Sequence, residues 1–119
     1  MSKMAILCNG DTPANIMPTL IMSSSGLAVG NEVVVFICPA GARWMLKGEL
    51  EKLGTPKGLP NPVALFNDIL DLGADVILCE LALINKDIDP NDLRDERIKI
   101  TKAPPFLMQI DDANITLSF

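Results

Sequence analysis

The chain has 119 residues, of which 49% are hydrophobic and 4% aromatic, and its formal net charge is −5. A chain of this length can bury a core without disulfides, so we expect one α/β domain over residues 1–119. The acidic balance, without a Lys/Arg cluster, argues against nucleic acid and against an anionic membrane surface as partners. No apolar run approaches the ~20 residues that span a bilayer, and no secretory signal is recognisable, so we expect a cytoplasmic protein.

The residue types that are missing exclude several kinds of chemistry. The sequence has three cysteines and no histidine. An odd number of cysteines without a CxxC pair argues against a disulfide framework. Without histidine, Ser–His and Cys–His couples and most zinc sites are excluded. The sequence therefore predicts neither a metal nor a resident cofactor.

The first half of the chain alternates between strand and helix signals. The apolar run Met4–Cys8 predicts a buried strand, and Thr12-Pro13 has the capping residue and proline typical of a helix start. Glu32–Cys38 is β-branched and continuously apolar, which favours a central parallel strand. After the turn Pro39–Gly41 we expect a second helix that carries Trp44.

The second half repeats this alternation with shorter segments. Cap-and-proline pairs and apolar runs mark the starts of the elements there. In chain order we expect a helix that starts at Pro62 and is ended by Gly73, a strand at Val76–Cys79, a helical turn at Leu81–Ile84, a turn at Asp89-Pro90, a strand at Arg97–Thr101, a helix from Pro104, and a strand at Asn114–Phe119.

This order of elements predicts the fold class. Strands that alternate with helices form a parallel sheet with right-handed crossovers. We therefore expect a three-layer, doubly wound α/β domain, with a mainly parallel sheet of about five strands and helices on both faces.

The three cysteines stand where the three clearest strands end. Cys8, Cys38 and Cys79 should thus lie at one edge of the sheet, where open parallel sheets bind ligands. Free cysteine is often a small buried hydrophobe, and we favour that role for Cys8 and Cys38. Cys79 is followed at once by a helical turn whose N–H groups favour a thiolate, although the carboxylate of Glu80 opposes this. We therefore expect Cys79 to be the working residue, at the rim of a crevice.

Other residues near this edge are candidates for a pocket. Asn9, Gly10 and Thr12 lie between a strand and a helix and could hold a small anion, although a plain turn and cap is the simpler interpretation. Gly41, in the turn after the second strand, completes the candidate set.

Four segments of the chain form a recognisable set: the turn at residues 9–12, the strand EVVVFI at 32–37, the Leu-Gly-Ala helix end at 72–74 and VILCELAL at 76–83. Together these segments resemble the DsrE/DsrF-like family of small sulfur-relay proteins. The resemblance implies that Cys79 accepts sulfur as a persulfide and passes it on, that sulfur donor and acceptor proteins are its partners, and that the protein assembles as a trimer or hexamer.

The leading hypothesis is therefore a sulfur carrier or sulfurtransferase-like protein. The alternatives are a non-catalytic binding or assembly subunit of the same fold, and a small-ligand domain that binds a nucleotide or flavin. A mean hydropathy of +0.31 and only 21% charged residues also favour a homo-oligomer, for which the resemblance favours a trimer. The segment around Trp44 and the loop Gly54–Pro60 are the expected contact surface.

Overall fold

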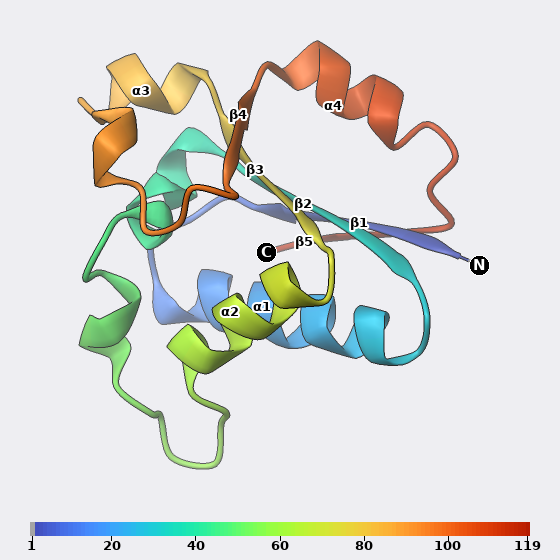
Figure 1. Cartoon of the computed structure of the whole chain (residues 1–119), viewed down its shortest axis with the longest axis horizontal. Helices are drawn as coiled ribbons and strands as arrows, with labels where there is room; N and C mark the ends of the chain where they lie inside the picture. The colour runs from blue at the N-terminus through green and yellow to red at the C-terminus, as the bar shows by residue number, and fades with distance from the viewer. Residues whose placement is uncertain (1) are drawn as a thin grey trace.

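The computed structural model describes residues 2–119 and contains one parallel sheet in the strand order β4-β3-β2-β1-β5 (Figure 1). Met1, the first residue of the expected domain, lies outside the described residues. All four pairs of neighbouring strands are parallel. The strands are β1 (Lys3–Cys8), β2 (Glu32–Ile37), β3 (Asp75–Cys79), β4 (Lys99–Thr101) and β5 (Ile115–Ser118).

Helices cover both faces of the sheet, which confirms the predicted fold class. Figure 1 shows α1 and α2 together on one face, α4 on the other, and α3 beyond the end of β3. The α-helices are α1 (Pro13–Ala28), α2 (Pro62–Asp71), α3 (Leu81–Asn85) and α4 (Ala103–Gln109). Three 3-10 segments complete the chain: η1 (Pro39–Met45), η2 (Leu50–Leu53) and η3 (Pro90–Asp92).

The two faces of the sheet bury unequal cores. Side chains of a strand alternate between faces, so every second residue of each strand points toward α1 and α2. There they form the larger core with residues such as Ile16, Leu20 and Phe66. The opposite core is small and consists of Val34, Phe36, Ile77, Cys79 and Phe106. The layer that contains Cys79 therefore has the smaller buried core of the two.

Helix α4 buries a single aromatic residue against the sheet, and its last residue, Gln109, is hydrogen-bonded to Asp75 of β3 and Lys3 of β1. Of its seven residues only Phe106 is buried, and the Phe106 ring stacks on Phe36 with 4.3 Å between centroids. The stacked pair is therefore the main apolar anchor of this layer.

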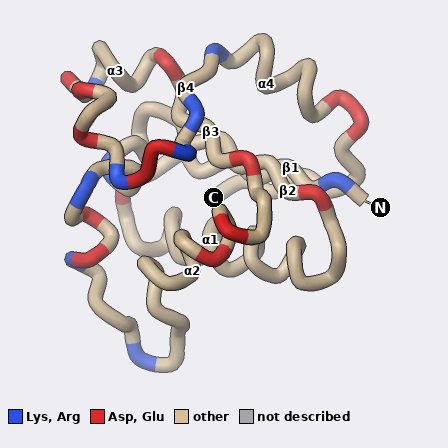
Figure 2. The backbone as a smooth tube through the Cα atoms, in the orientation of Figure 1, with Lys and Arg blue, Asp and Glu red and all other residues tan. Residues whose placement is uncertain are grey.

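The charged residues are unevenly distributed over the elements. Helices α1 and α4 carry no charged residue, whereas charges gather near β4 and along residues 43–57 (Figure 2).

The segment after β2 differs from the prediction. Instead of one α-helix around Trp44, the chain forms η1 and η2, with Leu46 extended between them. Leu46 makes an antiparallel bridge with Leu93, and the carbonyl of Met45 accepts from the N–H of Arg94 at 2.8 Å. These tertiary hydrogen bonds replace the helical ones. Trp44 is fully buried, so it cannot belong to the contact surface expected from the sequence.

Within residues 2–119, none of the helices combines the length and apolar character needed to cross a membrane.

We expect Phe106→Ala to lower the free energy of unfolding by about 3 kcal/mol, because it removes a buried ring and leaves a cavity against Phe36. Urea denaturation followed by circular dichroism measures the change. Leu107→Ala, on the same helix but 61% exposed, is the matched control and should cost no more than about 0.5 kcal/mol. Equal losses for the two variants would contradict the role of Phe106 as the anchor.

Candidate functional site at the carboxyl edge of the sheet

The carboxyl edge of the sheet holds all three thiols, but on two different faces. Cys8 and Cys79 are the last residues of β1 and β3, and Cys38 directly follows β2. Cys8 belongs to the larger core, under α1 and α2. Cys79 belongs to the small core beneath α4, and Cys38 packs against that same core. The structure thus brings Cys38 and Cys79 together and separates Cys8 from them.

The register of β2 and β3 makes Cys38 and Cys79 neighbours. Ile37 is paired with Leu78, so the next step along both chains brings Cys38 beside Cys79. The backbone of Cys38 is still extended, with φ −71° and ψ 163°, so the register continues through it. Neighbouring strands lie about 4.8 Å apart, and residues in register share a face. Two thiols therefore lie side by side at the end of the sheet.

The exposure of these thiols differs from what the sequence suggested. Cys79 is only 3% exposed and Cys8 is fully buried, whereas Cys38 is half-buried. Cys79 is paired with Thr101 of β4 on one side and shares its core with Phe106 on the face. Cys38 is therefore the more exposed of the two neighbouring thiols, in the position expected for Cys79.

The helical turn after Cys79 offers little support for a thiolate. Helix α3 has five residues, and a helix this short aligns few peptide dipoles. Its N-cap is Glu80, whose N–H already donates to the carbonyl of Thr101 at 3.0 Å. Glu80 itself is exposed. The environment of Cys79 is therefore set mainly by the neighbouring strands.

Burial shapes the ionisation of the other two thiols. Burial raises the pKa of Cys38 above its ordinary value, and the nearby thiols of Cys79 and Cys8 raise it further. Burial also raises the pKa of Cys8, against smaller opposing contributions from hydrogen bonds to Thr19 and Gly10. Both thiols are therefore held in the protonated form at neutral pH.

The candidate anion site between β1 and α1 is filled by the protein itself. The side-chain Oδ1 of Asn15 accepts from the N–H of Thr12 at 3.1 Å and from its Oγ1 at 2.6 Å. A Cβ on Gly10 would lie 2.2 Å from that oxygen, so the close approach requires glycine. The N–H of Asn9 donates to the carbonyl of Phe119 at 2.8 Å. These residues form a closed turn and cap.

Gly41 lets the segment after β2 pack directly against the end of β1. A Cβ at this position would lie 3.1 Å from the carbonyl oxygen of Cys8 and 3.2 Å from that of Gly10. The indole N–H of Trp44 donates to the carbonyl of Gly10 at 3.2 Å. Gly41 and Trp44 therefore hold the backbone that carries Cys38 in place.

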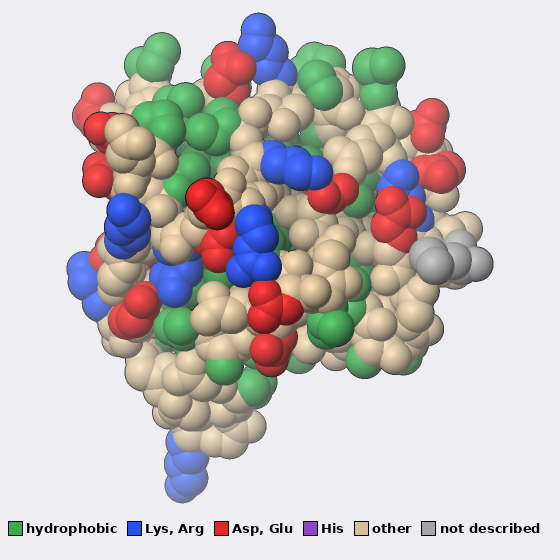
Figure 3. Space-filling model, in the orientation of Figure 1, with side chains coloured by type: hydrophobic (Ala, Val, Ile, Leu, Met, Phe, Trp, Pro, Cys, Tyr) green, Lys and Arg blue, Asp and Glu red, His purple; other side chains and the backbone are tan. Residues whose placement is uncertain are grey.

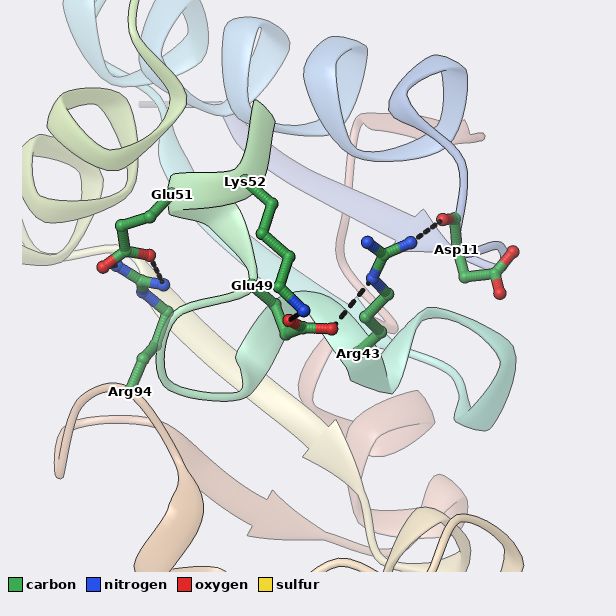
Figure 4. A network of polar contacts seen from close by, with 6 residues as sticks. All are labelled: Asp11, Arg43, Glu49, Glu51, Lys52 and Arg94. Atoms are coloured by element: carbon green, nitrogen blue, oxygen red, sulfur yellow. Dashed lines mark hydrogen bonds and ion pairs between the residues drawn. The ribbon is translucent and has the colours of Figure 1, made fainter. Parts of the chain in front are cut away.

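An ionic network that the sequence did not reveal fixes the same segment (Figure 4). Arg43 donates from Nε to Glu49 at 3.1 Å and from Nη1 to the carbonyl of Asp11 at 3.4 Å. Lys52 pairs with Glu49, and Arg94 pairs with Glu51 at 2.9 Å. Only Lys52 and Glu49 are at a helical spacing, whereas the partners of Arg43 and Arg94 lie at separations that no sequence pattern marks.

A small hollow opens beside the segment that follows Cys38, although Cys38 itself does not line it. Its volume is about 140 Å³, and its lining includes Pro39, Ala40, Arg43, Lys86 and Asp11. Within the described part of the chain, no group of three or more Cys, Asp or Glu residues could hold a metal ion. What the edge offers is thiol chemistry: a half-buried thiol, Cys38, and beside it a buried one, Cys79.

Comparison with known proteins supports the fold and leaves the chemistry open. No family model matches the sequence. "Uncharacterized protein MJ0760" of Methanocaldococcus jannaschii is 30% identical over 97 residues, which are 82% of this chain and 34% of that protein. The chain therefore spans about a third of the length of this curated relative.

Two solved structures have the same fold over their whole length. The ychN protein from E. coli superposes with a TM-score of 0.80 at 16% identity, and MTH1491, a protein of unknown function from Methanobacterium thermoautotrophicum, with 0.77 at 9% identity. Each comparison covers 100% of both chains. Both neighbours are small α/β proteins of the DsrE-like fold, and this chain shares that fold.

Proposed function

We propose that this protein is a small sulfur carrier of the DsrE/DsrF-like family, which accepts sulfane sulfur as a persulfide on Cys79 and passes it to a partner protein. The observation that carries the proposal is the position of Cys79 at the end of a central parallel strand of a DsrE-like fold, with Cys38 beside it. The fold, with its thiols at the edge where such sheets bind ligands, supports sulfur transfer over the other candidate functions.

The transfer needs no metal and no cofactor. The thiolate of Cys79 attacks the outer sulfur of a donor persulfide, the S–S bond of the donor breaks, and the donor leaves as a thiolate. Cys79 then carries the persulfide, and the same exchange with an acceptor thiolate discharges it. Because Cys79 is 3% exposed, the carried sulfur is shielded from small reductants.

The proposed partners are a sulfur donor and a sulfur acceptor protein in the cytoplasm, together with further copies of this chain. Four large apolar side chains project from the short helices near the thiol edge. Hydrophobic side chains gather over α3 and α4 in Figure 3. They include Leu81 (70% exposed), Ile84 (87%), Leu107 (61%) and Met108 (75%). This surface replaces Trp44 as the proposed contact between copies, with a trimer favoured by the family resemblance.

Cys79→Ser should abolish persulfide loading, because serine cannot form the S–S bond. Treatment with inorganic polysulfide followed by intact-mass spectrometry should add about 32 Da to the wild type and nothing at position 79 of the variant. Cys8→Ser, on the opposite face, is the matched control and should load like the wild type. Loading on Cys8 in the peptide map, with Cys79 unmodified, would refute the proposal.

The rate at which Cys38, the most exposed of the three thiols, reacts with an alkylating reagent should depend on pH. Because the pKa of Cys38 is raised, its iodoacetamide labelling should be slow near pH ~7 and should rise about tenfold per pH unit until the pKa is passed. Cys8, whose pKa is also raised but whose side chain is fully buried, should label far more slowly in the folded protein. Peptide mapping after timed labelling measures both rates, and a Cys38 rate that is flat from pH ~6 to ~9 would contradict the raised pKa.

Self-association should depend on the apolar surface of α3 and α4. Light scattering after size exclusion should give the wild type a mass that is a multiple of 12.8 kDa. Ile84→Glu should shift the mass toward that of a single chain, because it places a charge in an apolar contact. Val29→Glu, at a position 77% exposed after α1, should leave the mass unchanged. A wild-type mass of 12.8 kDa, that of a single chain, would refute the proposed self-association.

A further inference from the structure

We propose that Cys38 and Cys79 act as a dithiol pair, in which Cys38 resolves the Cys79 persulfide into an intramolecular disulfide and releases sulfide. The inference rests on the proposed function for the persulfide itself. The pairing of the two thiols rests only on the structure and can be tested on unloaded protein.

The register of the sheet selects this pair. A disulfide requires two Cα atoms about 4.4–6.8 Å apart, and residues in register on neighbouring strands, about 4.8 Å apart, meet that requirement. Cys38 and Cys79 are one step beyond the pair Ile37–Leu78, on the same face and in contact with the same small core.

Cys8 is excluded from the pair although its backbone is close. The carbonyl of Cys8 accepts from the N–H of Cys38 at 2.9 Å. Its register partner on β2, however, is Ile37, and both of those side chains point into the larger core. The sheet lies between the thiol of Cys8 and that of Cys79. Cys8 therefore serves as an internal control for any experiment on the pair.

The chemistry of the step balances without an outside oxidant. The thiolate of Cys38 attacks Sγ of Cys79, a bond forms between the two Sγ atoms, and the bond to the outer sulfur breaks. The outer sulfur leaves with the electron pair as hydrosulfide. The sulfane sulfur is thus reduced to sulfide while the two thiols are oxidised to a disulfide. A dithiol reductant then returns the pair to its starting state.

The surroundings of Cys38 slow this step near neutral pH. Burial and the neighbouring thiols of Cys79 and Cys8 favour the protonated form of Cys38, so only a small fraction is thiolate at neutral pH. The charged side chains at the hollow beside the segment that follows it are Arg43, Lys86 and Asp11. A loaded carrier therefore holds its sulfur long enough to meet an acceptor and discharges sulfide when none arrives.

The test follows the fate of the persulfide in protein loaded with inorganic polysulfide and desalted under anaerobic conditions. In the wild type, the mass should fall by about 34 Da as hydrogen sulfide leaves, with one sulfide released per Cys38–Cys79 linked peptide. Cys38→Ser should keep its adduct at least about tenfold longer, because the neighbouring nucleophile is gone. Cys8→Ser should discharge like the wild type.

The outcomes separate this inference from the proposed function. If Cys79 loads but Cys38→Ser discharges as fast as the wild type, the result supports the sulfur-carrier function and refutes the dithiol pair. If Cys79 does not load, the result refutes the sulfur-carrier function, and the unloaded protein is then oxidised with diamide. A Cys38–Cys79 linkage in that peptide map supports the pair on its own, whereas a linkage to Cys8, or none, refutes it.

Discussion

The alternation of side chains across a parallel sheet decides which thiols of this protein can react together. Three cysteines end three adjacent strands, yet the period of two sends Cys8 to one face and Cys38 and Cys79 to the other. The register then sets the spacing, because Ile37 and Leu78 are paired and the next residues must follow. A shift of one residue in either strand would separate the two thiols by the thickness of the sheet. The chemistry at this edge therefore depends on strand pairing.

The unequal layers place this chemistry where the protein is least firmly packed. The face under α1 and α2 carries the larger core, whereas α4 contributes one buried ring, Phe106. Segments with few buried apolar contacts open locally at a smaller free-energy cost than the global core. A buried thiol beneath α4 is thus exposed by local opening at a smaller free-energy cost than Cys8, which belongs to the larger core beneath α1.

The strands and the position of the cysteines at their ends could be predicted, because apolar runs and turn residues are local signals. The face and exposure of each cysteine could not be predicted in this way. Strands such as EVVVFI are apolar on both sides, so their pattern hides which residues point to which layer. The segment around Trp44 differs from the prediction for a related reason: the N–H of Arg94 donates to the carbonyl of Met45, and the N–H of Lys47 donates to the carbonyl of Asp92, in place of helical hydrogen bonds.

The raised pKa of Cys38 gives the site an order of events. In the proposed carrier, two nucleophiles would compete for a persulfide on Cys79: the neighbouring thiol and the thiol of an acceptor. Proximity favours Cys38 by a large effective concentration, but only its thiolate attacks, and each pH unit below the pKa lowers that fraction about tenfold. In the proposed carrier, the raised pKa of Cys38 therefore offsets part of the advantage that proximity gives it over an acceptor. The sheet that places the two thiols together also supplies the burial of Cys38.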